Sequence, residues 1–308
     1  MRVLIVRALK LGDFLTAVPA YRAVRRAFPH AHITLAAPRE FAELADVLDG
    51  AIDEIADVRG LDEPLPRGVA GADLGINLHG RGPQSHRRLL DARPARLLAF
   101  RHPAVAASGG GPAFDPTEHE VVRWCRLLRA YGIPAHPDDL DLAPPGIAVP
   151  FHVRGATLVH PGAASAARCW PAERWAAVAR SELRLGRRVI VTGGPAEIDL
   201  ARRIAAEAGV PSGNVYAGRT GLRELAALVA AAARVVCGDT GVAHLATAYR
   251  RPSVVLFGPT PPAQWGPPPR PYHRVLWNGT TGDPHADRVD PGLRAISVER
   301  VIEALRAP

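Results

Sequence analysis

The chain has 308 residues, of which 47% are hydrophobic and 22% charged, a composition typical of a soluble globular protein large enough for two domains. No run of about 18 uncharged apolar residues occurs, so a membrane span is not expected. The three cysteines, Cys125, Cys169 and Cys237, lack metal-binding spacing and suit a reduced cytosolic protein.

The formal net charge of +8 comes entirely from the second half of the chain. Residues 1–150 contain 18 Lys and Arg against 18 Asp and Glu, whereas residues 151–308 contain 20 against 12. This asymmetry favours an anionic ligand bound mainly by the second half. Nucleic acid is the competing explanation for so basic a chain, but the arginines are dispersed and no nucleic-acid motif is present, so we expect no nucleic-acid partner.

Apolar strand-like runs alternate with amphipathic helical stretches along the chain, which is typical of α/β domains with parallel sheets. In the first half, strands are predicted at residues 3–6, 32–36, 54–58, 74–78 and 96–100, and helices at about 13–28, 39–48, 83–90 and 117–131. A Pro- and Gly-rich stretch at residues 132–155 then predicts a linker.

The pattern restarts in the second half. Strands are predicted at residues 157–160, 188–191, 235–237 and 253–257, and helices at about 171–185, 195–208, 221–232, 241–249 and 298–306. Residues 259–292 are rich in Pro and Gly and predict a long loop-like excursion. We therefore expect two Rossmann-like α/β domains, residues 1–145 and 146–308, with a ligand cleft between them.

The turn after the first strand contains a candidate acid–base group. Arg7 and Lys10 precede Gly12, and Asp13 falls at or just inside the start of the next helix. In one interpretation Asp13 is simply the N-cap of that helix. In the other it faces the cleft as a general base, kept ionised by Arg7 and Lys10, which could instead contact an anionic ligand.

The turn after the predicted strand at residues 74–78 contains a group of basic residues. His79 and Arg81 are candidates for contact with an acceptor substrate, and a solvated basic surface is an equally good interpretation. The first strand of the second half ends at His160, and the loop after it contains Ser165 and Arg168, whose hydroxyl and guanidinium groups suit phosphate oxygens. The alternative is an ordinary loop with Arg168 in solvent.

The segment from Cys237 to Ala248 combines a strand end, a glycine-bearing turn and a helix start. Backbone N–H groups at the positive end of a helix bind phosphate readily, so Asp239, Thr240 and Gly241 are expected at an anion site. His244 lies four residues after Thr240 and therefore on the same helix face.

Other sequence patterns do not indicate a metal site or a different class of nucleotide-binding enzyme. Asp139-Leu-Asp141 has the spacing of a metal-binding Asp-x-Asp motif, but it lies in the predicted linker rather than at a strand end, and a surface loop is preferred. A Walker motif and a GxGxxG sequence after a strand are both missing, which argues against a P-loop NTPase and a typical NAD enzyme.

Four segments in order resemble the family 9 glycosyltransferases, whose best-known members are ADP-heptose:lipopolysaccharide heptosyltransferases. They are Val-Leu-Ile-Val-Arg…Leu-Gly-Asp…Pro-Ala (3–20), His-Pro-Gly-Ala…Arg-Cys-Trp-Pro (160–171), Val-Thr-Gly-Gly-Pro-Ala-Glu (191–197) and Gly-Asp-Thr-Gly-Val-Ala-His-Leu-Ala (238–246). The resemblance covers nearly the whole chain. It implies a GT-B fold, with the acceptor bound mainly by the first domain and the nucleotide sugar by the second. The closing helix at 298–306 often packs towards the first domain.

The resemblance also implies inverting transfer without a metal. Asp13 matches the proposed catalytic base of the family, and Asp239, Thr240, Gly241 and His244 match its donor diphosphate-binding turn. Arg168 falls where a lysine is common, which keeps the charge but changes the geometry of contact.

We therefore expect a cytoplasmic glycosyltransferase that moves a heptose-like sugar from an ADP-sugar, its substrate, without a cofactor. The acceptor is a hydroxyl of a cell-envelope glycan, a lipid-linked or lipopolysaccharide-type molecule, or a secondary metabolite. Peripheral contact with the inner face of the membrane and the oligomeric state are left open. The alternatives are another nucleotide sugar, or a nucleotide- or glycan-binding protein that has lost catalysis, against which Asp13 argues.

Overall fold

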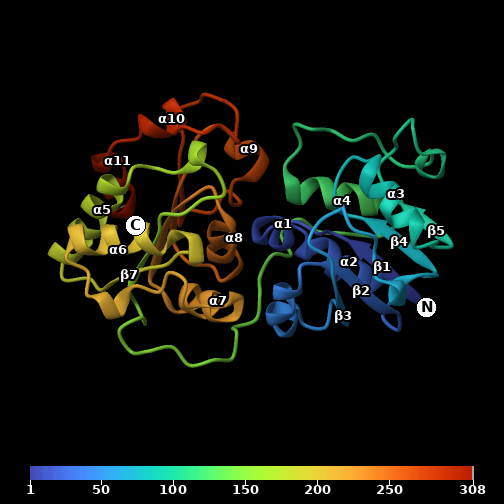
Figure 1. The fold of residues 1–308 in the computed structure, drawn as a ribbon, viewed down its shortest axis with the longest axis horizontal. Coiled ribbons are helices and arrows are strands. Elements are labelled where there is room, and N and C mark those ends of the chain that lie inside the picture. Colours follow the sequence, from blue (N-terminus) through green and yellow to red (C-terminus); the bar gives the residue numbers. More distant parts are fainter. Residues whose placement is uncertain (307–308) are drawn as a thin grey trace. The chain divides into compact units, whose positions relative to one another are not determined.

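The computed structural model describes residues 1–306, and the chain divides into two compact units, Met1–Ala143 and Pro144–Pro308. Each unit is an α/β domain with one parallel sheet and helices packed against it, as the alternating pattern predicts (Figure 1). The boundary lies inside the predicted linker at residues 132–155. Residues 132–155 contain no helix or strand, although Ile133, Ala135 and Val153 are buried.

The first unit contains a five-stranded sheet in the order β3-β2-β1-β4-β5, with every described pair of neighbours parallel. The strands are β1 (Arg2–Val6), β2 (His32–Ala37), β3 (Glu54–Asp57), β4 (Leu74–Asn77) and β5 (Arg96–Leu98). The central β1 has four consecutive buried residues, because helices cover both faces of a parallel sheet. Its last residue, Val6, pairs with Ala36 of β2 and Asn77 of β4.

The helices of the first unit are α1 (Leu11–Thr16), α2 (Val18–Ala27), α3 (Gln84–Asp91) and α4 (Glu120–Ala130), with 3-10 turns η1 (Arg39–Leu48), η2 (Arg67–Val69) and η3 (Ala106–Ser108). The single helix predicted at residues 13–28 is therefore two helices. Pro19 explains the break, because proline has no N–H to continue α1 but fits the first turn of α2. Residues 39–48 form a 3-10 rather than an α-helix.

The second unit has a five-stranded parallel sheet in the order β10-β9-β8-β6-β7. Its strands are β6 (Thr157–His160), β7 (Val189–Val191), β8 (Arg234–Gly238), β9 (Ser253–Leu256) and β10 (His273–Leu276). Strand β10 lies inside the predicted loop-like excursion at 259–292 and was missed. It is a short edge strand within a Pro- and Gly-rich stretch, so its four residues carry little periodic signal.

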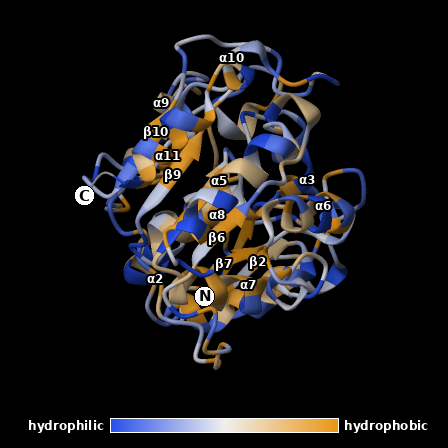
Figure 2. Cartoon of the chain, turned by 90° about the vertical axis from the view of Figure 1, so that its left-hand side faces the viewer, coloured by the Kyte–Doolittle hydropathy of each residue, from blue (hydrophilic) through white to orange (hydrophobic). Residues whose placement is uncertain are grey.

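Helices cover both faces of this sheet. The helices are α5 (Ala172–Arg184), α6 (Ile198–Ala208), α7 (Leu222–Ala231), α8 (Gly241–Ala248), α9 (Pro262–Trp265), α10 (Pro291–Arg294) and α11 (Val298–Arg306), with 3-10 turns η4 (Ala166–Arg168), η5 (Pro195–Glu197) and η6 (Ser212–Asn214). Helices α5, α6 and α11 lie on one face, and α7 and α8 lie on the other (Figure 1). Figure 2 shows the strands as mostly hydrophobic segments behind helices that combine hydrophobic and hydrophilic residues.

The closing helix α11 belongs to the core of the second unit. Its Val301 and Leu305 are buried against α5 and β9. Arg234, the first residue of β8, donates a 3.2 Å hydrogen bond to the Leu305 carbonyl near the helix end. The expected packing of this helix on the first domain stays a prediction. Among residues 1–306, no helix is long and apolar enough to cross a membrane.

Each sheet has one point where the direction of winding reverses. In the first unit this point lies between β1 and β4, and in the second between β6 and β8. Loops after two such strands leave in opposite directions, so an opening forms beyond their carboxyl ends and ligands of α/β sheets bind there. The residues that the sequence predicts to form the site lie in or beside the loops after these four strands.

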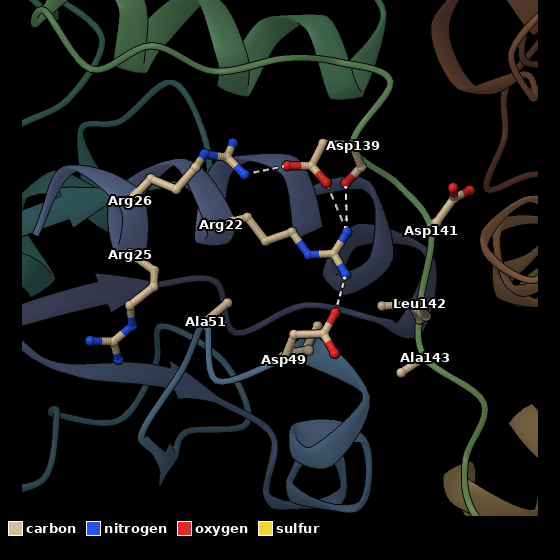
Figure 3. A pocket seen from close by; sticks show the side chains of 10 residues that line it. Arg22, Arg25, Arg26, Asp49, Ala51, Asp139, Asp141, Leu142 and Ala143 are labelled. Carbon is tan, nitrogen blue, oxygen red and sulfur yellow. Dashed lines mark hydrogen bonds and ion pairs between the residues drawn. The ribbon is translucent and has the colours of Figure 1, made fainter. Parts of the chain in front are cut away.

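The segment Asp138–Ala143, which ends the first unit, is held by an ionic network on α2 (Figure 3). Asp139 accepts hydrogen bonds from Arg22 at 2.9 Å and Arg26 at 2.6 Å, and Arg22 also pairs with Asp49 at 3.0 Å. These residues line a cavity of about 540 Å³ in which arginines and aspartates balance. Asp139 of the Asp-x-Asp pattern therefore lies in a loop, as predicted, and fastens the end of the first unit to α2.

We predict that Asp139→Asn lowers the free energy of unfolding by about 1 kcal/mol, because one partly buried carboxylate serves two guanidinium groups. Chemical denaturation measures the change, and high salt should reduce it. Asp138→Asn, at the exposed neighbouring position, is the matched control with little expected effect. Equal losses in the two variants would contradict the anchoring role.

Candidate active site

The candidate site of the first unit is built on a buried arginine. Arg7, directly after β1, has a fully buried side chain. Its guanidinium group donates to the backbone carbonyls of Asp13 and Leu78, to the Thr16 hydroxyl at 3.1 Å and to Glu120 Oε1 at 2.9 Å. Arg7 thereby joins the loops after β1 and β4 to α1 and α4. Since this side chain is wholly occupied inside the protein, it acts as a support for the site rather than as an exposed ligand group.

Glu120 supplies the counter-charge for Arg7. It is buried at the start of α4 and accepts hydrogen bonds from Trp124 Nε1 at 2.8 Å and from Arg123. The Arg7 guanidinium lies 4.8 Å from the centroid of the Trp124 ring. Although burial acts to raise it, the pKa of Glu120 is lowered overall by the charges of Arg7 and Arg123 and by hydrogen bonds from Arg7 and Trp124. A buried charge pair of this kind is stable because each partner is hydrogen-bonded.

Asp13 is the third residue of α1 rather than its N-cap, which is Lys10. Its Oδ2 accepts the Lys10 backbone N–H at 3.3 Å, and Oδ1 lies 3.6 Å from Arg7 Nη2. The side chain keeps 20% of its surface exposed. Asp13 therefore accepts a capping hydrogen bond at the start of α1 and still exposes part of its carboxylate at the switch point.

Burial raises the pKa of Asp13 above its ordinary value, and the charge of Glu120 adds to this effect. The charge of Arg7 opposes the rise, in the direction predicted from the sequence, but burial is the larger influence. Lys10 acts through its backbone N–H, while its side chain is exposed. Arg7 and Lys10 therefore both favour the ionised form of Asp13, and burial acts against them. That the two residues keep Asp13 ionised stays a prediction.

The loop after β4 is organised by Asn77. The Asn77 amide accepts the His79 backbone N–H at 2.8 Å and donates to Ser85 and His86, each at 2.8 Å. The ring of His79 accepts the Ala8 N–H through Nδ1 at 3.2 Å, which ties this loop to the one after β1. Burial, with help from the charge of Arg7, lowers the pKa of His79 to about 4, so its ring is neutral at pH 7. 

Two other predicted residues of this unit are more open. Arg81 is exposed, whereas Gly12 is half-buried in the first turn of α1. The structure therefore brings Arg7, Asp13 and His79 together around the ends of β1 and β4. Contact of Asp13 or His79 with an acceptor stays a prediction, whereas the predicted contact of Arg7 is not supported because its side chain is fully buried.

The second unit pairs Arg168 with Asp239 at its own switch point. Arg168 ends the short turn η4 after β6, and Asp239 directly follows β8. Arg168 Nη1 lies 3.7 Å from Asp239 Oδ2 and donates to the Asp239 carbonyl at 3.5 Å. Burial raises the pKa of Asp239 to about 6, and Arg168 opposes this rise. The solvent-only alternative for Arg168 is wrong, because its side chain is only 22% exposed.

Helix α8 begins beside this pair. Thr240 is its N-cap, Gly241 is its first residue, and both are half-buried. The His244 ring, also half-buried, lies edge-on to Trp265 of α9 with centroids 6.1 Å apart. The first turn of α8 therefore presents its positive end next to Arg168.

The loop with Ser165 and Arg168 is attached to the excursion that follows β9. Ser165 Oγ donates to the Pro284 carbonyl at 2.5 Å, and the backbone of Ala167 bonds to Ala286 and Asp290. Arg168 Nε approaches Ser165 Oγ at 3.5 Å. Ser165 thus fixes the loop that holds Arg168, and its predicted contact with phosphate stays a prediction.

His160 ends β6 and is buried, with Nδ1 2.9 Å from the Thr192 hydroxyl. Burial lowers its pKa, an effect opposed by the charge of Glu197. The Glu197 carboxylate occupies the space that a Cβ at Gly162 would need, with Oε1 only 1.7 Å from that position. Gly162 is therefore required for this close approach, and His160 lies inside the protein rather than on an open surface.

Comparisons with known proteins identify the family of the chain. The family model "Glycosyltransferase family 9 (heptosyltransferase)" matches residues 113–292, which is more than half of the chain. The chain belongs to glycosyltransferase family 9.

A curated relative of this family 9 protein is lipopolysaccharide heptosyltransferase 2 of Salmonella typhimurium. It is 30% identical over 154 residues, which cover 46% of this chain and 42% of the relative. Lipopolysaccharide heptosyltransferase 3 of Escherichia coli is 32% identical over 112 residues, or 36% of this chain and 33% of the relative. The matched regions thus span less than half of the length of these relatives.

The fold of the family 9 protein is GT-B, as predicted. The structure of E. coli ADP-heptose lps heptosyltransferase II has a TM-score of 0.77 at 23% identity, covering 100% of this chain and 98% of that one. E. coli heptosyltransferase WaaC, solved with ADP-2-deoxy-2-fluoro heptose, has a TM-score of 0.73 at 19% identity, with 99% of each chain covered. At these identities the likeness establishes the fold alone.

Sequence reasoning missed several residues that shape this family 9 site. Glu120, Asn77 and Thr192 were not among the predicted site residues. Glu197 accepts the Gly194 N–H at 2.6 Å at a helix start, but its close approach to Gly162 is not visible in the sequence. Spacing in the sequence does not identify the partners of Glu120 or Thr192, because the contacts with Arg7 and His160 join distant parts of the chain. Among residues 1–306 no cluster of three or more His, Cys, Asp or Glu suited to a metal is found.

The raised pKa of Asp239 predicts a pH-dependent cost in stability. The folded pKa of about 6 exceeds the unfolded value of about 3.9, so this group favours folding when protonated and loses that contribution as pH rises from about 4 to 6. We expect Asp239→Asn to raise the free energy of unfolding at pH 8 by up to about 3 kcal/mol and to change it little at pH 4. Denaturant unfolding at both pH values tests this, with exposed Asp199→Asn as control. A gain of the same size at both pH values would contradict the assignment.

Proposed function

We propose that this protein is an inverting glycosyltransferase that moves a heptose-like sugar from ADP-heptose to a hydroxyl of a cell-envelope glycan. The observation that carries the proposal is the placement of one partly open carboxylate, Asp13, at the switch point of the first unit and one cation, Arg168, at that of the second. Membership of family 9 supports the reaction class, and the WaaC structure with an ADP-heptose analogue supports the choice of donor.

Asp13 is proposed as the general base. It takes the proton of the acceptor hydroxyl while the acceptor oxygen attacks the anomeric carbon from the side opposite the leaving group, which inverts the configuration. A carboxylate whose pKa is raised towards neutrality is a better base than one in water. Arg7 and Glu120 are proposed as positioning residues, because they fix the backbone of α1 and set the charge beside Asp13.

The second unit is proposed to bind the leaving ADP. Negative charge grows on the diphosphate as the sugar–oxygen bond breaks, and Arg168 with the first turn of α8 supplies positive charge there. This proposal needs no metal and no cofactor. Since a carboxylate repels phosphate, we assign Asp239 the role of orienting Arg168. Thr240, Gly241 and His244 are proposed to contact the donor.

The acceptor is assigned to the first unit. Lys10 and Arg81 are exposed cations near the loops after β1 and β4, and they suit an acidic or phosphorylated glycan, including a lipid-linked one. We place the reaction in the cytoplasm, where a nucleotide-sugar donor is available, with such an acceptor presented at the inner face of the membrane.

Removal of the base should abolish turnover without loss of donor binding. We predict that Asp13→Asn lowers kcat for transfer from ADP-heptose by about 10²- to 10⁴-fold, the usual contribution of a general base. Calorimetry should find ADP binding unchanged, because the donor groups belong to the other unit. The exposed Asp62→Asn is the charge-matched control. Full transfer activity in Asp13→Asn would refute the mechanism and favour another base.

The donor assignment is tested separately with a panel of ADP, GDP, UDP and CDP in a calorimetric assay. We expect preference for ADP, and about tenfold or greater weakening by Arg168→Ala, because a charge-assisted contact to phosphate is lost. Exposed Arg202→Ala on α6 is the control. Preference for another nucleotide would point to a different nucleotide sugar, and indifference to all four would overturn the proposal.

A further inference from the structure

The ring of His79 has one nitrogen bound by the protein and one left open. His79 is the second residue after β4, and its side chain is half-buried. Its Nδ1 accepts the Ala8 backbone N–H at 3.2 Å, whereas Nε2 has no hydrogen-bond partner within residues 1–306. Nε2 is not among the enclosed side-chain atoms of these residues that lack a partner, so solvent reaches it.

The bond from Ala8 fixes which ring nitrogen carries the proton. A nitrogen that accepts an N–H must keep its lone pair free, so the neutral ring is protonated at Nε2. Burial, aided by the charge of Arg7, lowers the pKa of His79 to about 4, and the ring is therefore neutral at pH 7. His79 thus presents an uncharged N–H donor to the open side of its loop.

The loop that holds this donor is fixed from within the first unit. The Asn77 amide accepts the His79 backbone N–H at 2.8 Å and donates to Ser85 and to His86, each at 2.8 Å. His86 Nε2 lies 2.6 Å from the Phe100 carbonyl. Asn77, Ser85 and His86 are all buried. The position of the His79 ring is therefore set before a ligand binds, which lowers the entropic cost of a contact with it.

The buried guanidinium group of Arg7 places this donor near the proposed base. Arg7 donates to the carbonyl of Leu78, the residue before His79, and its Nη2 lies 3.6 Å from Asp13 Oδ1. Ala8, which donates to the His79 ring, directly follows Arg7. Asp13 and His79 are therefore grouped around one cation, the first as a partly open acceptor of a proton and the second as an open donor.

We propose that His79 Nε2–H donates a hydrogen bond to an acceptor hydroxyl that neighbours the reacting one, and so orients the acceptor against Asp13. An uncharged donor suits a hydroxyl oxygen of a glycan, whereas acidic groups of the same molecule suit the exposed Lys10 and Arg81. A site that hydrogen-bonds a hydroxyl discriminates against molecules that lack it, so His79 contributes to acceptor specificity. This inference rests on the proposed function, because it assigns a contact with the acceptor of that reaction.

Two amide variants separate this role from a purely structural one. Asparagine places an oxygen acceptor close to the position of Nδ1, and glutamine places an N–H donor close to that of Nε2. His79→Asn is therefore expected to keep the bond from Ala8 and lose the donor, and His79→Gln to do the reverse. Steady-state transfer from saturating ADP-heptose to lipopolysaccharide from cells that lack heptose measures kcat/KM for the acceptor.

We expect His79→Asn to lower this kcat/KM by about five- to tenfold, the usual effect of losing one hydrogen bond, and His79→Gln to lower it by about twofold. His30→Asn, at an exposed position in the loop before β2, is the control and should leave it unchanged. A loss in His79→Gln that equals or exceeds the loss in His79→Asn would assign His79 a structural role and overturn the proposal. Circular dichroism and thermal unfolding confirm that each variant is folded.

The donor is also measured without turnover, on the full chain labelled with ¹⁵N. Long-range ¹H–¹⁵N correlation spectra at pH 7 distinguish a protonated from an unprotonated ring nitrogen, and the spectrum of His79→Asn identifies the signals of His79. We expect a proton on Nε2 and none on Nδ1. A proton on Nδ1 alone, or on both nitrogens, would overturn the proposal whatever the activity.

Asp13→Asn distinguishes failure of this inference from failure of the proposed function. Full transfer by Asp13→Asn would refute the proposed mechanism as a whole. Loss of transfer in Asp13→Asn together with full acceptor kcat/KM in His79→Asn would overturn the role of His79 alone.

Discussion

The reversal of winding in each parallel sheet is the constraint on which the candidate site depends. At β1 and β4, and again at β6 and β8, neighbouring strands send their following loops in opposite directions. Backbone groups and side chains at these four strand ends are therefore left uncovered by helices. Asp13, His79, Arg168 and Asp239 all lie there, although the two sheets have different strand orders.

The charged side chains at these strand ends differ in how fully their partners neutralise them. Arg7 is fully buried, and its bonds to Glu120, Thr16 and two carbonyls satisfy it. The Arg168–Asp239 pair is looser at 3.7 Å, and burial keeps the pKa of Asp239 raised. The first arrangement stabilises the fold around the site. The second leaves Arg168 loosely paired beside a carboxylate that is costly to ionise, as is common at functional positions.

Ionic clusters outside the site hold each unit together. On α2, arginines and aspartates balance, and the network fastens Asp139 and the end of the first unit (Figure 3). In the second unit, Arg187 and Arg234 lie beside the buried carboxylate of Glu182, which also accepts a hydrogen bond from the Thr157 hydroxyl. Each cluster neutralises charges that are partly removed from water, which favours a structural role.

The sequence by itself determined the class of the fold, because hydrophobic periodicity is local: alternating strands and helices, two α/β domains and four motif-bearing turns were all predictable. It placed Asp13, Arg168 and Asp239 just after strands for the same reason. It failed for β10, whose four residues lie in a Pro-rich stretch, and for the helix break at Pro19.

Only the tertiary structure decided which charges meet. Glu120 lies 113 residues from Arg7, and Asp239 lies 71 from Arg168, so no spacing rule could pair them. The rise in the pKa of Asp13 could not be predicted, because neighbouring charges can be seen in a sequence but burial cannot. Local pattern specifies the elements, whereas packing between distant segments sets desolvation, charge pairing and therefore chemistry.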